Sequence, residues 1–516
     1  MDTNANITHG TTLQTLARLL DEAGLLVSAS PETIALPVTG AACDSRVVRP
    51  GDVFCCKGAA FRPAFLASAL SAGAVAYLCE EPLAPSLDKV AGPAPRLVVS
   101  DVRRAMAIVS AEAFGHPDRA IPVVGMTGTK GKSTVAYMLR SIVDAGEPYS
   151  RASIMGSIET YDGIEREESH NTTPEAPDLW RHLANARDSR HTPMIMEVSS
   201  HGLKYDRVSG LRLAAGAFLN IGRDHISPVE HPDFEDYFTS KLRIFEHTDT
   251  AVVNLDTDQL DRVMDAASRC PRLLTFSATR PDADIWAEDV TPGFGFTDFV
   301  AHTPSWTGKM SVDMPGLFNV DNALCAIAFC ELLGIPQEQV RDGLLRCSVP
   351  GRMELLRTST EHVLGIVDYA HNTLSYQRFF SSVTREFPGR RIAVVMGAPG
   401  NKAQERRREL PQEASRWADL LVYTAEDPAH ERVEDICAEM VANTPEGQDY
   451  LVIPDRTQAI RHVVEMALDS GEDWLVCLLA KGDETRQHVG DEFLPMETDG
   501  DVFTAAILEH GGTRGA

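Results

Sequence analysis

Short apolar runs alternate along the chain with longer stretches in which apolar residues recur at the spacing of one helix face. The short runs predict buried strands and the longer stretches predict helices. Strands are predicted at residues 52–55, 74–78, 194–198, 251–254, 363–367, 391–396, 420–424 and 474–479. Helices are predicted at residues 64–72, 403–417 and 456–468, and residues 294–300 alternate with the period of a strand. The repeated strand–helix order in the last third predicts a doubly wound parallel sheet, which binds ligands at the carboxyl ends of its strands.

Two breaks divide this pattern. Gly115-His116-Pro117-Asp118 precedes a new apolar run, and Ser348-Val349-Pro350-Gly351 separates a helical stretch from a new series of strands. At about 150 residues per domain, a chain of this length suggests three domains. We therefore predict a three-domain α/β protein. A small α/β N-terminal domain spans residues 1–118, a central P-loop ATPase domain with a parallel sheet spans 119–348, and a C-terminal Rossmann-like domain spans 349–516.

The chain is acidic, with 48 Lys and Arg against 74 Asp and Glu and a formal net charge of −26. Such a surface repels nucleic acid and anionic lipid, so we expect neither as a partner. The ten cysteines lack the spacing of zinc ligands, which indicates reduced thiols in a cytoplasmic protein. The first residues carry no export signal, and no apolar stretch is long enough to span a bilayer. We expect a cytoplasmic monomer.

A glycine-rich loop is the strongest local signal. An apolar run leads into Thr127-Gly128-Thr129-Lys130-Gly131-Lys132-Ser133, and an amphipathic stretch follows. Small residues let backbone N–H groups turn toward a phosphate at a helix N-terminus. Lys132 can neutralise phosphate charge and the Ser133 hydroxyl can bind Mg²⁺. Met126 stands where the usual P-loop pattern has its first glycine. The loop predicts binding of a nucleoside triphosphate.

Two polar clusters follow the loop along the chain. The apolar run 194–198 includes Glu197 and leads into Ser199-Ser200-His201, so its carboxylate is predicted at a strand end, where it can hold a metal. Asn220-Ile221-Gly222-Arg223-Asp224-His225 then combines a cation, a carboxylate and an imidazole. Together behind one phosphate loop, these groups indicate an enzyme rather than a set of capping residues.

These motifs and others resemble, in order, those of the Mur ligases, and most closely the UDP-N-acetylmuramoyl-tripeptide synthetase branch, which adds the third residue of the peptidoglycan stem peptide. Besides the phosphate loop, the matching strings are Asp44-Ser45-Arg46 with Gly51-Asp52-Val53-Phe54, Asn171-Thr172-Thr173-Pro174-Glu175, Met196-Glu197-Val198-Ser199-Ser200-His201, Arg223-Asp224-His225, Ser240-Lys241, Phe318-Asn319-Val320-Asp321-Asn322, Pro350-Gly351-Arg352-Met353-Glu354, Asp368-Tyr369-Ala370-His371 and Lys481-Gly482-Asp483-Glu484. One such string is weak evidence, whereas the whole series covers nearly the entire chain.

The resemblance implies ATP-driven amide formation through an acyl phosphate, with two Mg²⁺ ions as cofactors. The residues implied to act on the reacting groups are Lys132, Glu197, His225 and Lys241. Ser133 and Glu197 would bind the first Mg²⁺, and His225 the second, supported by Lys241 as an N6-carboxylysine. The implied ATP-binding residues are Thr127, Gly128, Thr129, Lys130, Gly131, Lys132, Ser133, Asn322, Arg352 and Asp368.

The resemblance also implies a UDP-N-acetylmuramoyl-dipeptide site. Its members would be Ser45, Asn171, Thr172, Thr173, Ser199 and Arg207. Two positions depart from the family pattern. Tyr205 stands where the family often has Gln, and Phe61-Arg62-Pro63 stands where it usually has Asp-Gly-His.

The incoming amino acid is expected to contact Lys402, Asp427, Ala429 and Glu484. Members that add diaminopimelate carry Asp-Asn-Pro-Arg, whose Arg can grip the distal carboxylate. Here the string is Glu426-Asp427-Pro428-Ala429, and its acidic residues suit a cationic side chain. Lys402 replaces the usual Arg, and Asp483 replaces the usual His. We therefore expect lysine, with ornithine or another diamino acid as alternatives.

Two other functions remain open from the sequence. A folylpolyglutamate-synthetase-like ligase shares the phosphate loop and carboxylate activation, but it lacks the domain that carries Asp44-Ser45-Arg46. A non-catalytic, ligase-derived protein that binds nucleotide or muropeptide would have little use for Lys132, Glu197, His225 and Lys241 together.

Overall fold

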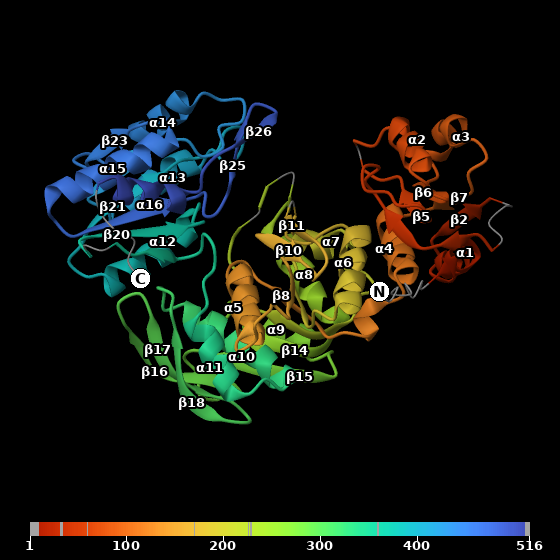
Figure 1. The fold of residues 1–516 in the computed structure, drawn as a ribbon, viewed down its shortest axis with the longest axis horizontal. Coiled ribbons are helices and arrows are strands. Elements are labelled where there is room, and N and C mark those ends of the chain that lie inside the picture. The colour runs from red at the N-terminus through yellow and green to blue at the C-terminus, as the bar shows by residue number, and fades with distance from the viewer. Residues whose placement is uncertain are drawn as a thin grey trace. The chain divides into compact units, whose positions relative to one another are not determined.

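The structure is a computed structural model that describes residues 10–30, 35–58, 60–169, 171–224, 226–227, 230–358 and 361–510. The chain forms two compact units. The first comprises Met1–Trp286, Thr303–Trp306 and Leu324–Val340, and the second comprises Ala287–His302, Thr307–Ala323 and Arg341–Ala516. Figure 1 shows the elements of both.

The first unit opens with a five-stranded sheet of order β2-β7-β6-β5-β4, parallel except for β2. Its strands are β2 (Leu26–Ala29), β4 (Gly40–Ala42), β5 (Asp52–Cys55), β6 (Ala76–Glu80) and β7 (Arg96–Val99), and its helices are α1 (Leu13–Glu22), α2 (Pro63–Ser71), α3 (Ala84–Ala91) and α4 (Val102–Ala113). A short pair, β1 (Thr11–Thr12) and β3 (Pro37–Val38), lies apart from this sheet. Alternate strand residues face opposite layers, because Val53 and Cys55 share a core with α1 and α4, whereas Phe54 shares one with α2 and α3.

The second sheet of the first unit has the order β11-β10-β9-β12-β8-β13-β14-β15-β16. Its strands are β8 (Val123–Thr127), β9 (Ser153–Met155), β10 (Glu159–Tyr161), β11 (Arg166–Glu168), β12 (Met194–Glu197), β13 (Leu213–Phe218), β14 (Thr248–Asn254), β15 (Arg272–Ser277) and the start of β16 (Ile285–Pro292). Its helices are α5 (Lys132–Asp144), α6 (Ala176–Ser189), α7 (Ser200–Lys204), α8 (Phe234–Leu242) and α9 (Leu260–Ala267), with short 3-10 turns η1 (Pro117–Arg119) and η2 (Arg243–His247). Strands β9, β12, β8, β13, β14 and β15 are parallel, and β10 and β11 extend the sheet antiparallel.

Strand β8 lies between β12 and β13, and all five of its residues are buried. The register pairs Glu197 with Met126 and Phe218 with Thr127. Three parallel strands therefore end together at one edge of the sheet, where polar residues can converge on a ligand.

In the second unit the sheet has the order β19-β20-β24-β21-β22-β23, parallel except for β19. Its strands are β19 (Glu354–Leu356), β20 (Val363–Asp368), β21 (Arg391–Met396), β22 (Leu420–Tyr423), β23 (Tyr450–Val452) and β24 (Trp474–Leu479). The unit also holds two antiparallel hairpins, β17 (Thr297–His302) with β18 (Thr307–Val312) and β25 (Arg486–Val489) with β26 (Glu492–Pro495). Helices α10 (Asn319–Leu333) and α11 (Gln337–Leu345) contribute residues to both units.

Helices cover both faces of the β19–β24 sheet. Alternation decides which residues face which layer, because Val394 and Met396 pack with α12 (Thr373–Glu386), α13 (Arg406–Ala414) and α14 (Val433–Ala442). Ala393 and Val395 pack with α15 (Arg456–Ser470) and α16 (Asp499–Glu509). The predicted doubly wound C-terminal sheet is confirmed.

The predicted strands are confirmed to within a few residues, but the bounds of two predicted elements are wrong. The helix expected at 403–417 is α13, which spans Arg406–Ala414. It begins late because Asn401 and Ala403 have φ angles of 61° and 47°, outside the helical region, and residues 415–417 form a turn. The strand expected at 294–300 is β17, which begins at Thr297. The ten cysteines are free thiols. In the described part of the chain, no helix is both apolar enough and long enough to span a membrane.

Candidate active site

The phosphate loop links β8 to α5 at the edge where the parallel strands end. Gly131 caps α5 with a φ angle of 93°, a conformation that favours glycine. Gly128 lies so close to the next loop that an added Cβ would approach Leu219 to 2.9 Å. This segment therefore folds into a tight turn, and the helix that follows it begins at Lys132, as phosphate binding requires.

Asn220 holds the phosphate loop in place. Its backbone oxygen accepts a hydrogen bond from the N–H of Thr129, and its side chain both accepts from the N–H of Lys130 and donates to its carbonyl oxygen. The Thr129 hydroxyl also accepts from the N–H of Gly222 and from the Tyr237 hydroxyl. The 220–222 segment thus fixes the shape of the loop. Next to it, Lys130 forms an ion pair with Asp224 at 3.2 Å.

Two lysines meet at the carbonyl oxygen of Gly128. The Nζ atoms of Lys132 and Lys241 each donate to it at 2.9 Å. Lys241, on α8, is only 2% exposed. Burial lowers the pKa of its amine well below the ordinary value, and the neighbouring charge of Lys132 lowers it further. Both effects disfavour the charged form of the Lys241 amine.

Glu197 and Ser133 supply buried oxygen ligands beside the loop. The Ser133 hydroxyl donates to the Glu197 carboxylate at 3.1 Å, and Ser157 donates to it through both its N–H (2.8 Å) and its hydroxyl (3.1 Å). Gly156 leaves room for this carboxylate, since an added Cβ would lie 2.3 Å from it. Carboxylate and hydroxyl oxygens at a phosphate loop suit Mg²⁺, so the chemistry of this donor set fits that ion.

A hydrogen-bonded chain runs from Glu197 toward the residues expected to hold the peptide substrate. Thr173 donates to the backbone oxygen of Glu197 at 3.0 Å and contacts the Ser199 hydroxyl at 3.1 Å. The guanidinium of Arg207 donates to the backbone oxygen of Thr173 and forms an ion pair with Glu175, both within 3.0 Å. Glu175 also forms an ion pair with Lys57 at 2.9 Å.

The other expected substrate residues join this network only in part. Thr172 contacts the Ser157 hydroxyl at 3.0 Å, whereas Asn171 is exposed. Ser45 is half-buried in the turn after β4. Near the carboxyl ends of β5 to β7 lies a cavity of about 400 Å³ whose wall includes Lys57 and Arg103. His225 lies outside the described residues.

In the second unit, Asp368 ends β20 and closes a turn. Its two carboxylate oxygens accept from the N–H groups of Met353 and Ala370, both at 2.8 Å. The guanidinium of Arg352 lies 4.4 Å from the centre of the Tyr369 ring. The Tyr369 hydroxyl in turn donates to Glu484 at 2.8 Å. Asp368 and Arg352 are therefore held next to each other.

Asn322 lies in the first turn of α10. Its side-chain N–H donates to Asn319 at 2.9 Å, and both residues are buried. The residues expected to bind ATP are thus divided between the two units, since the phosphate loop belongs to the first and Asn322, Arg352 and Asp368 belong to the second.

The residues expected to select the amino acid lie on three neighbouring loops of the second unit. The buried ammonium of Lys481 forms ion pairs with Asp427, at 2.8 Å, and with Glu484. The N–H of Gly400 donates to the backbone oxygen of Asp427, which joins the loop carrying exposed Lys402. Ala429 has a φ angle of 49°.

The acidic loop offers less free charge than its sequence suggests. Asp427 is paired with Lys481, and Glu431 is paired with Arg407 at 2.8 Å. Glu426 is buried, and its Oε2 accepts no hydrogen bond from any described residue. Burial raises the pKa of its carboxyl. Glu426 therefore carries a buried carboxylate oxygen that has no donor among the described residues.

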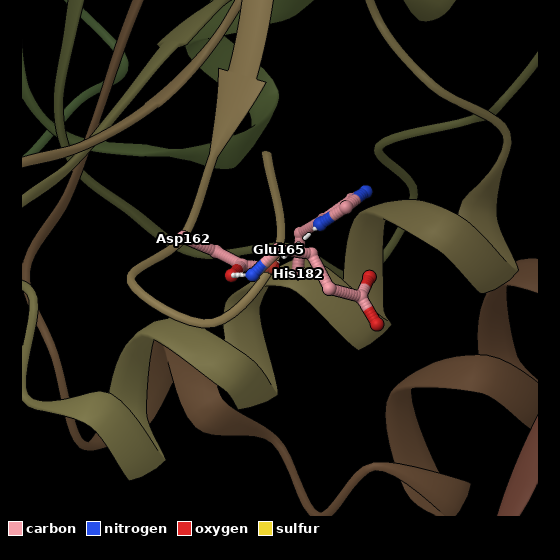
Figure 2. A group of neighbouring side chains, drawn as sticks. All are labelled: Asp162, Glu165 and His182. Atoms are coloured by element: carbon pink, nitrogen blue, oxygen red, sulfur yellow. Dashed lines mark hydrogen bonds and ion pairs between the residues drawn. The ribbon is translucent and has the colours of Figure 1, made fainter. Parts of the chain in front are cut away.

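A separate cluster has the composition of a metal site but the contacts of a structural one. Asp162, Glu165 and His182 offer ligand atoms within 4.8 Å of one another. Figure 2 shows the three side chains. Both ring nitrogens of His182 are engaged, with Asp162 at 2.6 Å and Glu167 at 2.9 Å. Glu165 pairs with Arg181. These contacts occupy both ring nitrogens of the imidazole, and the Arg181 guanidinium lies 3.2 Å from its Nε2, which disfavours a cation there.

Comparison with known proteins identifies the family. Residues 126–330 match the Mur ligase middle domain, and residues 351–482 match the Mur ligase glutamate ligase domain. The chain is 34% identical to the UDP-N-acetylmuramyl-tripeptide synthetase of Lactobacillus delbrueckii subsp. bulgaricus, over 96% of this chain and 99% of that relative. It is also 34% identical to the UDP-N-acetylmuramoyl-L-alanyl-D-glutamate–L-lysine ligase of Enterococcus faecalis, over 88% of each. The chain belongs to the Mur ligase family.

Solved structures agree with this assignment. A UDP-N-acetylmuramoyl-L-alanyl-D-glutamate–2,6-diaminopimelate ligase superposes with a TM-score of 0.61 at 25% identity, over 92% of this Mur ligase and 96% of that chain. Mycobacterium tuberculosis folylpolyglutamate synthase shares the fold, with a TM-score of 0.58 at 16% identity over 73% of this chain and 92% of that chain. This Mur ligase is an ATP-dependent ligase, and its family uses ATP and Mg²⁺. The predicted fold class and family are confirmed.

Ser157 is the residue of this Mur ligase site that the sequence did not reveal. It gives Glu197 two hydrogen bonds, yet it lies between two short strands, outside every matched string. The one available signal is the preceding Gly156, whose missing side chain makes room for the carboxylate.

Proposed function

We propose that this Mur ligase adds the third amino acid, lysine or another diamino acid, to UDP-N-acetylmuramoyl-L-alanyl-D-glutamate in peptidoglycan synthesis. The relatives at 34% identity carry the names of enzymes with this activity. One observation in the structure carries the proposal. The hydrogen-bonded chain from Ser133 through Glu197 to Thr173 connects the phosphate loop with the residues that would hold the substrate carboxylate. ATP and an acid would therefore meet at one edge of the β8 sheet.

The reaction has to bring two anions, a carboxylate and a triphosphate, into line. Fixed cations lower the cost of that approach. The substrate carboxylate would attack the γ-phosphorus, ADP would leave, and the amine of the incoming amino acid would then displace phosphate from the acyl phosphate. Lys132 is the first residue of α5, and its amine would turn from the Gly128 oxygen to the phosphates when they bind.

Ser133 and Glu197 would hold one Mg²⁺, which supplies charge neutralisation when bound. The second metal position is proposed for His225 with Lys241. A neutral amine adds to CO₂ with loss of a proton and becomes a carbamate anion, so the buried, depressed-pKa amine of Lys241 supports an N6-carboxylysine there. The rest of the phosphate loop and Asn322, Arg352 and Asp368 would hold ATP.

The substrate would lie against Thr172, Thr173, Ser199 and Arg207, with Asn171 and Ser45 farther along it. Arg207 already balances Glu175, so its guanidinium is held in place before the substrate carboxylate arrives. Ala429 stands where diaminopimelate-adding members have Arg, so the amino-acid site would lack the guanidinium that binds a second carboxylate. Asp427 and Glu484 are already paired with Lys481, so it is the acceptor of Glu426, unpartnered among the described residues, that would favour a cationic terminus. Lysine therefore fits better than diaminopimelate.

For location, oligomeric state and domain bounds, the proposal is the same as the prediction from the sequence. The protein would work as a cytoplasmic monomer, with domains at 1–118, 119–348 and 349–516. The limits of the two matched family domains, 126–330 and 351–482, fall inside the second and third of these.

A single assay tests the function. The purified chain is given ATP, Mg²⁺ and UDP-N-acetylmuramoyl-L-alanyl-D-glutamate, and phosphate release is compared with lysine, ornithine, diaminopimelate or no amino acid. We expect release with lysine and a product heavier by one lysyl residue in mass spectrometry. Release with dihydrofolate and glutamate instead would favour the folylpolyglutamate-synthetase-like alternative. No release with any acceptor, together with ATP binding, would favour the non-catalytic one.

A further inference from the structure

A buried carboxylate anchors the segment that leads into α10. Glu386, the last residue of α12, is 5% exposed. Its two carboxylate oxygens accept from the backbone N–H of Gly316 at 2.8 and 3.0 Å. One turn earlier on α12, the Ser382 hydroxyl accepts from the N–H of Leu317 at 3.3 Å. Two successive backbone donors of the segment are thus held by one helix.

The anchored turn determines where α10 begins. Gly316 has a φ angle of 104°, and its carbonyl oxygen accepts from the N–H of Asn319 at 2.7 Å. The Asn319 side chain then donates to the backbone oxygen of Pro315 and accepts from the Asn322 side chain. Hydrogen bonds therefore run without interruption from Glu386 through Gly316 and Asn319 to Asn322.

We propose that Glu386 is a positioning residue for the nucleotide, because it fixes the turn from which the Asn322 amide is presented. This inference rests on the proposed function, in which Asn322 contacts ATP. Glu386 itself touches no reacting group in this scheme. Its effect would reach the nucleotide only through the turn, so it should alter ATP binding and leave binding of the UDP-linked substrate unchanged.

The charge of Glu386 gives the anchor a dependence on pH. Burial raises the pKa of its carboxyl to about 7, while the N–H of Gly316, the Ser382 hydroxyl and the N–H of Leu317 oppose the rise. The charged group acting on it is Arg385, which also lowers the pKa. On the facing segment, Asp313 is paired with Arg357 at 3.9 Å. Protonation near neutral pH would turn a charged acceptor into a neutral one.

The sign of this effect separates positioning from stability. A carboxyl whose pKa is raised by folding binds its proton more tightly in the folded state, so acid stabilises the fold through Glu386. The same protonation weakens the bonds to Gly316, because hydrogen bonds to ionised groups are stronger. Acidification should thus weaken nucleotide binding without a loss of folding stability from this group.

The test compares the wild type with Glu386→Gln, which keeps the size of the side chain and removes its charge. The dissociation constant of Mg·ATP is measured by calorimetry at about pH 8.5 and about pH 6. For Glu386→Gln we expect binding roughly fivefold weaker at the higher pH, by the difference between a charged and a neutral acceptor. The wild type should lose a similar factor on acidification and the variant should lose little. The KM for the UDP-linked substrate should stay unchanged.

Glu413→Gln is the matched control, because Glu413 is another buried glutamate of the second unit, bound to Gln377, Arg416 and Trp417. Equal ATP affinity in wild type and Glu386→Gln, or an equal loss in Glu413→Gln, would overturn the inference.

If Glu386→Gln does not fold, Ser382→Ala takes its place. This variant should weaken ATP binding less and keep the pH dependence. Unchanged ATP affinity in Ser382→Ala would also overturn the inference. A wild type that binds ATP but forms no amide would refute the proposed function alone, and one that binds no ATP would refute both.

Discussion

The amines of Lys132 and Lys241 donate to one carbonyl oxygen, that of Gly128, at 2.9 Å each. Burial, together with repulsion from the nearby charge of Lys132, lowers the pKa of the Lys241 amine well below its ordinary value. The two lysines therefore differ in how strongly burial acts on their amines. Burial thus disfavours the charged form of Lys241, whereas Lys132 begins the helix at the phosphate loop.

Replacing Lys132 with Met should remove the cation while keeping most of the side chain. We expect kcat to fall by about 100- to 1,000-fold, because the lost charge acts mainly on the transferred phosphoryl group. Steady-state phosphate release measures this. Lys130→Met should be milder, since that ammonium is balanced by Asp224. Equal losses in the two variants would contradict the separate role given to Lys132.

Glu197→Gln should make the enzyme need more Mg²⁺. The amide keeps an acceptor for Ser133 and Ser157 but lacks the charge that holds a divalent cation. We expect turnover roughly 100-fold lower at low Mg²⁺, with partial recovery as Mg²⁺ is raised. Ser157→Ala removes one of its two bonds to the carboxylate and should cost far less. A Glu197→Gln variant with an unchanged Mg²⁺ titration would exclude Glu197 as a ligand.

Lys241→Arg should inactivate the enzyme even though the positive charge is retained. A guanidinium stays protonated and cannot form a carbamate, whereas the buried amine of Lys241 can. In the wild type, ¹³C NMR after addition of labelled bicarbonate should show a carbamate signal that Lys241→Arg lacks. Full activity of Lys241→Arg would rule out the modification as a requirement.

The sequence predicted the fold because its main signals are local. In the strand containing Val394 and Val395, alternate residues face opposite helical layers, and the pattern is visible along the chain. The phosphate loop was equally readable, since glycines and Lys132 must be adjacent. Contacts between segments far apart in the sequence could not be predicted in this way. Glu386 meets Gly316 across 70 residues of sequence, and nothing in either neighbourhood announces the pairing.

The acidic loop shows a second limit of sequence reading. Asp427 was predicted to act as a free charge, but Lys481 from another loop is its partner. Glu431 farther along the same loop is likewise paired, with Arg407 of α13. Counting carboxylates in a string overestimates the field they create, because their partners lie elsewhere in the chain. Only the folded arrangement shows that a buried Glu426 oxygen has no donor among the described residues.

Ala429→Arg should shift selection away from lysine. The new guanidinium would repel a cationic side chain and could pair with a distal carboxylate. We expect kcat/KM for lysine to fall by roughly tenfold or more and diaminopimelate to become a better substrate. Ala429 already has a positive φ angle, so the longer side chain adds no new backbone strain. Ala429→Met, of similar length without charge, separates crowding from electrostatics; an equal effect of both variants would exclude the electrostatic explanation.

Stability should depend on His182 with a defined sign. Burial lowers the pKa of this imidazole, but its hydrogen bonds to Asp162 and Glu167 outweigh burial, and the net pKa is raised. A raised pKa stabilises the fold fully below the unfolded value of about 6.5, and that contribution is lost as pH rises through the folded value. His182→Gln should therefore cost about 1–3 kcal/mol in acid and less in alkali. Urea unfolding of wild type and variant at several pH values measures the difference.

His362→Gln is the control, because it removes an exposed imidazole beside Asp473 and should change stability little. A cost for His182→Gln that grows with pH would contradict a protonated imidazole in the fold.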